Sequence, residues 1–249
     1  MRMEEYIAFL SEKGEKETEL LRLREGTPLG VDACGEAVLS QKREHVYNTR
    51  HTSVTGLRRT GFIRRLIITL SCLYDKNEAN FFVVSPRAEY GELLRLRSLD
   101  ITVPFVREKA DLDAALACVK ELVGAYAQGE GYPKLFLVLD GLEEVDGCNE
   151  NGDFEEYRAF IEATARNKNV EIISGTELMK SIFSGNPGVF VGVGNCLVTT
   201  REEGKADVTY VGDDSSLSMP TALTFPDAPS IMETIIFINS LPVKTEENK

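Results

Sequence analysis

The sequence predicts an α/β domain whose mostly parallel β-sheet is covered by helices on both faces. Two observations predict this class. Short, fully apolar segments recur along the chain, and helical segments of ten or more residues separate them. Strands that are apolar throughout are typical of parallel sheets buried on both sides, and parallel neighbours require crossover connections of that length. A chain of 249 residues can bury such a core without disulfides or metals.

The expected elements follow one another along the chain. Predicted strands are the β-branched run His51 to Thr55, the apolar runs Phe81 to Val84, Leu135 to Leu139 and Val170 to Ile173, and the late runs Val189 to Val193, Cys196 to Thr199 and Val208 to Val211. Predicted helices are Gly61 to Tyr74, Ala110 to Ala127, Phe154 to Arg166 and Met232 to Leu241. This alternation of strands and helices defines the α/β class.

Composition divides the chain into three parts. Residues 1–26 are expected to form a helical arm that ends at Gly26-Thr27-Pro28, residues 27–243 the α/β domain, and residues 244–249 a flexible tail. The arm either packs on the domain or links it to something upstream.

Charge and cysteine content restrict the function classes. The net charge is −12, which argues against binding DNA, a polyanion. The five cysteines are widely spaced without a CxxC pair, so we expect reduced thiols. Acidic residues interrupt any signal-peptide-like start, and no apolar run is long enough to span a bilayer. We therefore expect a cytoplasmic domain. The two histidines, His45 and His51, show no metal-site spacing, and no nucleophile–base pair is evident.

The first strand-to-helix turn is the first candidate site, because ligands of open parallel sheets bind at the carboxyl ends of strands. Gly56 and Gly61 have the spacing of a Walker A loop, G-x-x-x-x-G-K-[S/T], which wraps a phosphate with backbone N–H groups. Phe62 stands at the lysine position and Ile63 at the Ser/Thr position. These side chains neither neutralise a phosphate nor ligate Mg²⁺. An ordinary turn remains an equally open interpretation. The candidate nucleotide-binding residues of this degenerate loop are Gly56, Arg58, Arg59, Thr60 and Gly61.

The second candidate site is the apolar run Leu135 to Leu139, which ends in Asp140 as a Walker B strand does. Gly141 stands where an active ATPase usually has the glutamate that polarises water. Glu143 and Glu144 follow, and a solvated turn is the simpler interpretation of this pair. Asp140 is also consistent with capping the next element.

Together these segments resemble the FtsK/SpoIIIE family of P-loop motor ATPases. Pro28 to Asp32, followed by Gly35 to Val38, is similar to the family's PLGxDxxGxPV segment. His51 to Gly56 is similar to the HLLVAG that leads into its Walker A loop, and Phe81 to Arg87 to its FxLIDPKG strand. Val170 to Thr176 lies where the family has a sensor strand, but it lacks the usual glutamine.

This resemblance covers about residues 28 to 211 and implies a RecA/FtsK-type P-loop NTPase fold. Within the family, the degenerate Walker A loop is most similar to the last ATPase domain of the EssC/EccC motors of type VII secretion. The resemblance implies sister ATPase domains or a homo-oligomer as partners, together with the signal peptide of a secreted substrate. It implies contact with a membrane only through a longer parent protein of which this domain would be a part.

The chemistry of the loop predicts that hydrolysis is lost, and that ATP with Mg²⁺ binds weakly or not at all. Arg58 and Arg59 are the residues expected to replace the missing positive charge. With Arg64 and Arg65 they form a local basic cluster, for which a solvated face and a docking surface both stay open.

Three functions are open from sequence. The first is a regulatory or substrate-docking module of a larger motor, without ATPase activity of its own. The second is a weakly active ATPase that recruits a lysine such as Lys134 or Lys180, or a lysine of a partner subunit. The third is a DNA-translocase-related module, against which the net charge argues.

Overall fold

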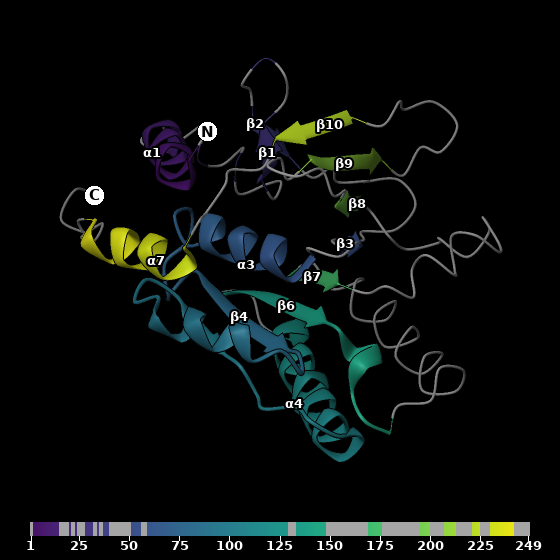
Figure 1. The fold of residues 1–249 in the computed structure, drawn as a ribbon. Helices are drawn as coiled ribbons and strands as arrows, with labels where there is room; N and C mark the ends of the chain where they lie inside the picture. The colour runs from purple at the N-terminus through teal and green to yellow at the C-terminus, as the bar shows by residue number, and fades with distance from the viewer. Residues whose placement is uncertain are drawn as a thin grey trace.

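The computed structural model describes residues 2–14, 20, 23, 28–31, 34, 37–39, 51–55, 59–128, 133–147, 169–175, 195–199, 207–212, 221–224 and 230–241. Its described strands form one sheet in the order β2-β1-β10-β9-β8-β3-β7-β6-β4-β5. Figure 1 shows this sheet with helices on both sides. The predicted α/β class with a mostly parallel sheet is therefore confirmed.

Parallel pairing joins the strands on one side of the sheet. These strands are β3 (His51–Thr55), β4 (Ala79–Val84), β5 (Asp100–Thr102), β6 (Lys134–Asp140), β7 (Val170–Gly175) and β8 (Asn195–Thr199). The rest of the sheet is antiparallel and contains β1 (Pro28–Val31), β2 (Ala37–Leu39), β9 (Asp207–Gly212) and β10 (Thr221–Thr224). β7 lies between β3 and β6, so the carboxyl ends of these three strands share one edge.

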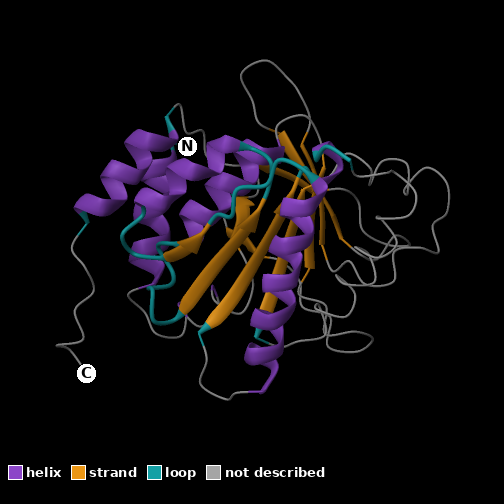
Figure 2. Cartoon of the chain, turned by 90° about the horizontal axis from the view of Figure 1, so that it is seen from below, coloured by secondary structure: helices purple, strands orange, loops and turns teal. Residues whose placement is uncertain are grey.

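Side chains of the central strands alternate between two cores. Phe81 and Val83 of β4 face one core, whereas Phe82 and Val84 face the other. The first core receives α3 (Arg59–Leu70), and the second receives α4 (Lys109–Gln128). Figure 2 shows a long helix running across one face of the strands. Burial on both faces explains why these strands are continuous apolar runs.

The first core also holds both terminal helices. Met3, Tyr6, Ile7 and Leu10 of α1 (Met3–Gly14) are fully buried there. α7 (Ile231–Ser240) buries Ile235 and Ile238 in the same core. The described part of the N-terminal arm thus packs on the domain. No helix in the described ranges combines the length and apolar character that crossing a membrane requires.

Several predicted elements are confirmed with small changes in their bounds. β3, β4, β6, β7, β8, β9, α4 and α7 all occur where apolar patterning places them. The predicted helix Gly61 to Tyr74 is wrong at both ends, since α3 spans Arg59–Leu70. The 3-10 helices η1 (Ala88–Arg95) and η2 (Leu142–Glu144) were not predicted. The predictions for residues 154–166 and 189–193 lie outside the described residues.

Candidate functional site

The candidate site lies at the shared edge formed by the carboxyl ends of β3, β7 and β6. Three segments meet at this edge: the first turn of α3, the β6–η2 turn, and η1 after β4. Asp140, the last residue of β6, pairs in register with Gly175, the last residue of β7. The site therefore occupies the position at which open parallel sheets bind ligands.

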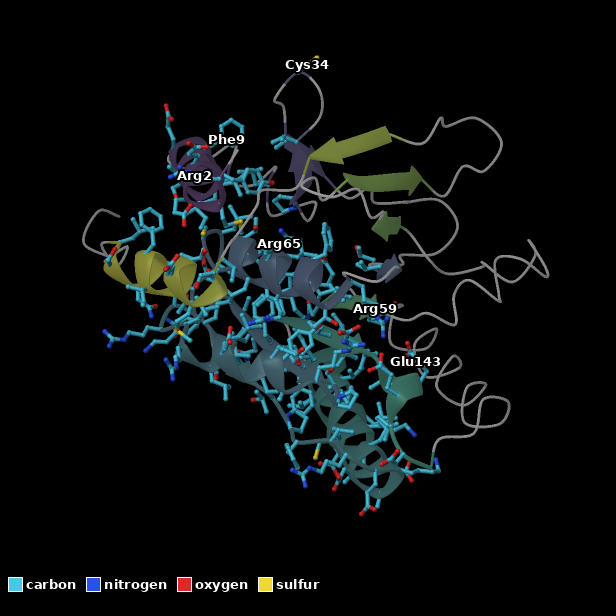
Figure 3. All side chains as sticks on the ribbon, in the orientation of Figure 1. Arg2, Phe9, Cys34, Arg59, Arg65 and Glu143 are labelled. Atoms are coloured by element: carbon cyan, nitrogen blue, oxygen red, sulfur yellow. The ribbon has the colours of Figure 1, made fainter. Side chains whose placement is uncertain are left out.

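Arg59 is the central residue of this site. Its side chain is 2% exposed and comes from the first turn of α3. Nε donates a hydrogen bond to Asp140 Oδ1 at 3.0 Å, while Nη2 donates to Glu143 Oε1 at 3.0 Å and to Glu144 Oε1 at 2.7 Å. Arg59 and Glu143 lie together where α3 meets the β6–η2 turn (Figure 3). One guanidinium thus joins three carboxylates across the edge of the sheet.

Asp140 is fully buried, and both of its carboxylate oxygens accept hydrogen bonds within the chain. Oδ1 accepts from Arg59, and Oδ2 accepts from Thr60 Oγ1 at 2.6 Å and from the Tyr90 hydroxyl at 3.0 Å. Buried carboxylates are stable only when they are paired in this way. The Walker B-like aspartate is accordingly committed to internal contacts.

The electrostatics of the cluster favour charged Arg59 and neutral Tyr90. Burial lowers the pKa of Arg59, but the negative charges of Asp140 and Glu143 outweigh burial and raise it above its ordinary value. Burial raises the pKa of Tyr90 well above 10.0, and the neighbouring Asp140 charge raises it further. Tyr90 therefore acts as a hydrogen-bond donor to Asp140 at neutral pH.

A second set of ion pairs surrounds the cluster on its outer side. Arg87, which follows β4, pairs with Glu144 and lies 4.0 Å from Asp140 Oδ2. Arg64 of α3 pairs with Glu92 of η1. These contacts hold η1 and the segment before it against α3 and the β6–η2 turn.

Two glycines shape the backbone around Asp140. A Cβ at Gly175 would clash with Asp140 Oδ1 and would lie 2.7 Å from Ile63 Cδ1. Gly141 has φ of 72°, a left-handed conformation that favours glycine, and its N–H donates to the Gly175 carbonyl at 2.9 Å. Glycine at position 175 thus leaves room for the Asp140 carboxylate, and glycine at position 141 permits the left-handed turn that follows it.

The loop-like segment differs from the Walker A expectation. Gly56 and Arg58 lie outside the described residues. Arg59 and Thr60, which the sequence analysis placed in the loop, lie in the first turn of α3 together with Gly61, the predicted first residue of the helix. A Cβ added to Gly61 would meet open space, and its φ is not positive. Within α3, Gly61 is not required for a tight turn.

The residues at the lost Walker positions are part of the core. Phe62 and Ile63 are fully buried and belong to the first core. Ile63 Cδ1 nevertheless reaches the site, since it lies 2.7 Å from where a Cβ at Gly175 would stand, next to Asp140 Oδ1. At this place the chain therefore offers a methyl group instead of a metal-ligating hydroxyl.

The described members of the predicted basic cluster, Arg59, Arg64 and Arg65, do not form an exposed surface, and Arg58 lies outside the described residues. Arg59 is buried among carboxylates, and Arg65 is 8% exposed with its Nε donating to the Gly61 carbonyl. Arg64 pairs with Glu92. The arginines of α3 are thus used within the domain, since Arg59 and Arg64 pair with carboxylates of distant segments and Arg65 donates to a backbone carbonyl of its own helix.

Three further sequence-based alternatives can be judged from the structure. Lys134 begins β6, so the length of that strand separates it from Asp140, and it pairs with Glu171 at 2.5 Å. Recruitment of Lys134 to the site is therefore contradicted, while Lys180 lies outside the described residues. Glu143 is 14% exposed and ion-paired rather than solvated. Gly141, not Asp140, is the N-cap residue of η2.

Sequence reasoning did not identify Tyr90 or Gly175 as site residues, and it gave Glu143 and Glu144 no partner. A usable signal was present for the glutamates. The loop-like segment contains an arginine, and acidic residues follow the Walker B-like aspartate. Opposite charges in these two segments could have predicted that they pair with each other. Among the described residues, no group of three or more His, Cys, Asp or Glu side chains is arranged to hold a metal ion.

Comparisons with known proteins agree on the fold. The cytoplasmic domain of the Thermomonospora curvata type VII secretion ATPase EccC is similar over 85% of this chain, with TM-score 0.56 and 14% identity. ATPases 2 and 3 of the same EccC, in complex with a signal sequence peptide, match over 82% of this chain with TM-score 0.56 and 13% identity. ATPases 2 and 3 of Geobacillus thermodenitrificans EssC match over 81% with TM-score 0.51 and 13% identity.

These similarities establish the P-loop ATPase-type α/β fold predicted from the sequence, with secretion-motor ATPase domains as structural neighbours. The chain spans 30% of the EccC cytoplasmic domain and 41% of each of the two-ATPase structures. No family model and no curated protein matches the sequence.

Proposed function

We propose that this chain is a P-loop domain that does not hydrolyse nucleotide and serves as a regulatory or substrate-docking module of a secretion motor. The observation that carries the proposal is that both carboxylate oxygens of Asp140 already accept hydrogen bonds from side chains of the same chain. Its two oxygens accept hydrogen bonds from Arg59, Thr60 and Tyr90. In active P-loop NTPases the aspartate at this position helps to hold Mg²⁺.

The side chains at the site do not fit Mg²⁺ with ATP. Three carboxylates, from Asp140, Glu143 and Glu144, oppose two guanidinium groups, from Arg59 and Arg87, so the cluster carries a formal charge of −1. Binding a polyphosphate requires surplus positive charge, and every described arginine here is already paired with a carboxylate. Phe62 and Ile63 supply neither a cation nor a metal ligand.

We expect the missing groups to lower the rate of hydrolysis by a large factor. Phosphoryl transfer depends almost entirely on positioning and charge neutralisation. Loss of the loop lysine, the Mg²⁺-binding hydroxyl and the catalytic glutamate removes three such contributions. If each is worth on the order of 3 kcal/mol, hydrolysis slows by many orders of magnitude even without strict additivity.

The partners that we propose follow from the structural neighbours. The EccC and EssC structures contain tandem ATPases, and one EccC structure holds a signal sequence peptide. We infer that this chain works beside sister ATPase domains or copies of itself, on the cytoplasmic side, and takes part in docking a secreted substrate. A DNA-translocating role is disfavoured by the net charge of −12.

Isothermal titration with Mg²⁺ and ATP, combined with a phosphate-release assay, tests this proposal. We expect no saturable heat and no phosphate release above buffer. The alternative is a weakly active ATPase. Turnover at ordinary ATPase rates of about 1–100 s⁻¹ that disappears in Asp140→Asn would establish that alternative and refute the proposal.

A further inference from the structure

η1 is unusually long for a helix of its type. It runs for 8 residues, Ala88–Arg95, as a 3-10 helix, whereas 3-10 segments longer than about three or four residues are uncommon. Hydrogen bonds of the 3-10 type lie near both of its ends. The Tyr90 N–H donates to the Arg87 carbonyl at 3.4 Å, and the Leu96 N–H donates to the Leu93 carbonyl at 3.0 Å. Contacts around η1 therefore favour the 3-10 form over the commoner α-helix.

The sequence of η1 fits two helical forms. Tyr90, Leu93 and Leu96 recur every third residue and are buried, which matches the turn of a 3-10 helix. Leu94 is 57% exposed, because it lies about 120° around a 3-10 helix from Tyr90. In an α-helix Leu94 would lie about 40° from Tyr90 and join the buried face, whereas Leu96 would turn about 120° away from it. Conversion to an α-helix thus exchanges one buried leucine for another.

Hydrogen bonds at both ends hold η1 at the length of a 3-10 helix. At its start, the Tyr90 hydroxyl donates to Asp140 Oδ2 at 3.0 Å. At its end, η1 lies beside α7 (Figure 1). There Asn239 accepts from the Arg97 N–H at 3.1 Å and donates to the Arg95 carbonyl at 2.8 Å. An α-helix of 8 residues is about 4 Å shorter than the 3-10 helix, because its rise per residue is about 1.5 Å rather than about 2.0 Å. An α-helical η1 would therefore lose the bonds at one end.

An ion pair on the side of η1 also depends on its helical form. Glu92 pairs with Arg64 of α3. In an α-helix Glu92 would turn by about 40° relative to Tyr90, which displaces it from this pair. The form of η1 is therefore linked to α7 at one end, and to α3 and Asp140 at the other.

We propose that η1 is a two-state helix through which the position of α7 and the arrangement of the Asp140 site influence each other. While Asn239 holds its C-terminal end, η1 is a 3-10 helix that keeps Leu94 exposed and Glu92 on Arg64. When α7 moves away, η1 shortens to an α-helix, Leu94 turns into the first core and Glu92 leaves Arg64. Because such coupling is reciprocal, loosening η1 from α3 also favours its release from α7. The proposal goes beyond the proposed function and does not depend on whether the site binds nucleotide.

NMR spectra of the full chain test this proposal, because the two helical forms bring different hydrogens together. In a 3-10 helix the Tyr90 Hα lies close to the Glu92 N–H, whereas in an α-helix it lies close to the Leu94 N–H. We expect the wild-type chain to show the Tyr90–Glu92 contact alone. Asn239→Ala removes both hydrogen bonds to α7, so the ratio of the Tyr90–Leu94 contact to the Tyr90–Glu92 contact should rise at least about tenfold.

Three further variants make the test specific. Ser240→Ala is the matched control on α7, since Ser240 donates to the Phe237 carbonyl rather than to η1, and it should leave the ratio unchanged. Arg64→Met should raise the ratio about threefold with α7 still in place, so it tests the proposal even if Asn239→Ala fails to fold. Adding Leu94→Ser to either variant should restore the wild-type ratio, because the α-helical form then buries no additional apolar side chain.

Several results would overturn the proposal. One is a wild-type spectrum that already shows the Tyr90–Leu94 contact. Another is an unchanged ratio in folded Asn239→Ala or in Arg64→Met. A ratio that rises equally in Ser240→Ala, or that stays raised after Leu94→Ser is added, is a third. Loss of both contacts in folded Asn239→Ala would show that η1 unwinds instead of shortening, which also contradicts the proposal.

Discussion

Arg59 Nε donates to Asp140 Oδ1 at 3.0 Å across 81 residues of sequence, and both side chains are almost completely buried. This pair joins the first turn of α3 to the last residue of β6. In a buried ion pair of this kind, removing one partner destabilises the fold by more than the intact pair stabilises it. The reason is that the remaining charge stays buried without a partner. The first predictions follow from that asymmetry.

Replacing Arg59 with Met should lower the free energy of unfolding by about 3–5 kcal/mol, because Asp140 and Glu143 would lose their buried cation. Arg64→Met is the matched control on the same helix. Its partner Glu92 is 44% exposed, so a loss of about 1 kcal/mol or less is expected. Urea denaturation followed by circular dichroism measures both. Equal losses would contradict the assignment of Arg59 as the central residue.

The two glutamates that pair with Arg59, Glu143 and Glu144, should contribute differently to the free energy of unfolding. Glu143 is 14% exposed and Glu144 is 40% exposed, so solvent screens the second pair more strongly. Glu143→Gln should therefore destabilise the protein more than Glu144→Gln, whose effect should be about 0.5 kcal/mol and should diminish further at high salt. Denaturation at low and high ionic strength checks this order, and a reversed order would argue against the described geometry.

Alanine substitutions at two glycines should act in opposite directions. Gly175→Ala should destabilise the protein by about 2 kcal/mol or more, since its Cβ would clash with Asp140 and crowd Ile63. Gly61→Ala should stabilise it by about 0.5–1 kcal/mol, because Gly61 is helical with open space at Cβ. Thermal melts of the two variants distinguish these outcomes. Destabilisation by Gly61→Ala would indicate that a loop conformation is retained there.

Stability should decrease in alkali partly through Tyr90. Its pKa in the folded state is raised well above 10.0, so the unfolded chain loses this proton first as pH rises. The Tyr90 contribution is fully present below pH 10 and is lost above it. Tyr90→Phe should therefore show a shallower decline in the free energy of unfolding between pH 10 and 12, measured by urea denaturation. An unchanged slope would show that Tyr90 is ionised in the folded protein or exposed to solvent.

The fold was largely predictable because its strands are strongly patterned. Phe81 to Val84 and Leu135 to Leu139 are apolar throughout, and that pattern follows directly from burial on both faces. The strands β5 (Asp100–Thr102) and β10 (Thr221–Thr224) were missed because three or four residues are too few to show a period.

The site was only partly predictable because its key contacts are long-range. The motif spacing singled out Asp140 and Arg59, but no local pattern reveals that they pair with each other. Arg59 and Thr60, in the first turn of α3, both donate to Asp140. The motif for a phosphate-binding loop placed these two residues in a loop, whereas the structure has them in a helix with their side chains bonded to Asp140.

The central claim is that Arg59 stays paired with the carboxylates of the site. The arginine Nε–H resonance in a ¹⁵N-correlated NMR spectrum tests this claim most directly. The account predicts a slowly exchanging Nε–H signal that is lost in Arg59→Lys, shifts in Asp140→Asn, and stays unchanged when Mg²⁺ and ATP are added. A rapidly exchanging Arg59 signal, or one displaced as ATP saturates the protein, would contradict it.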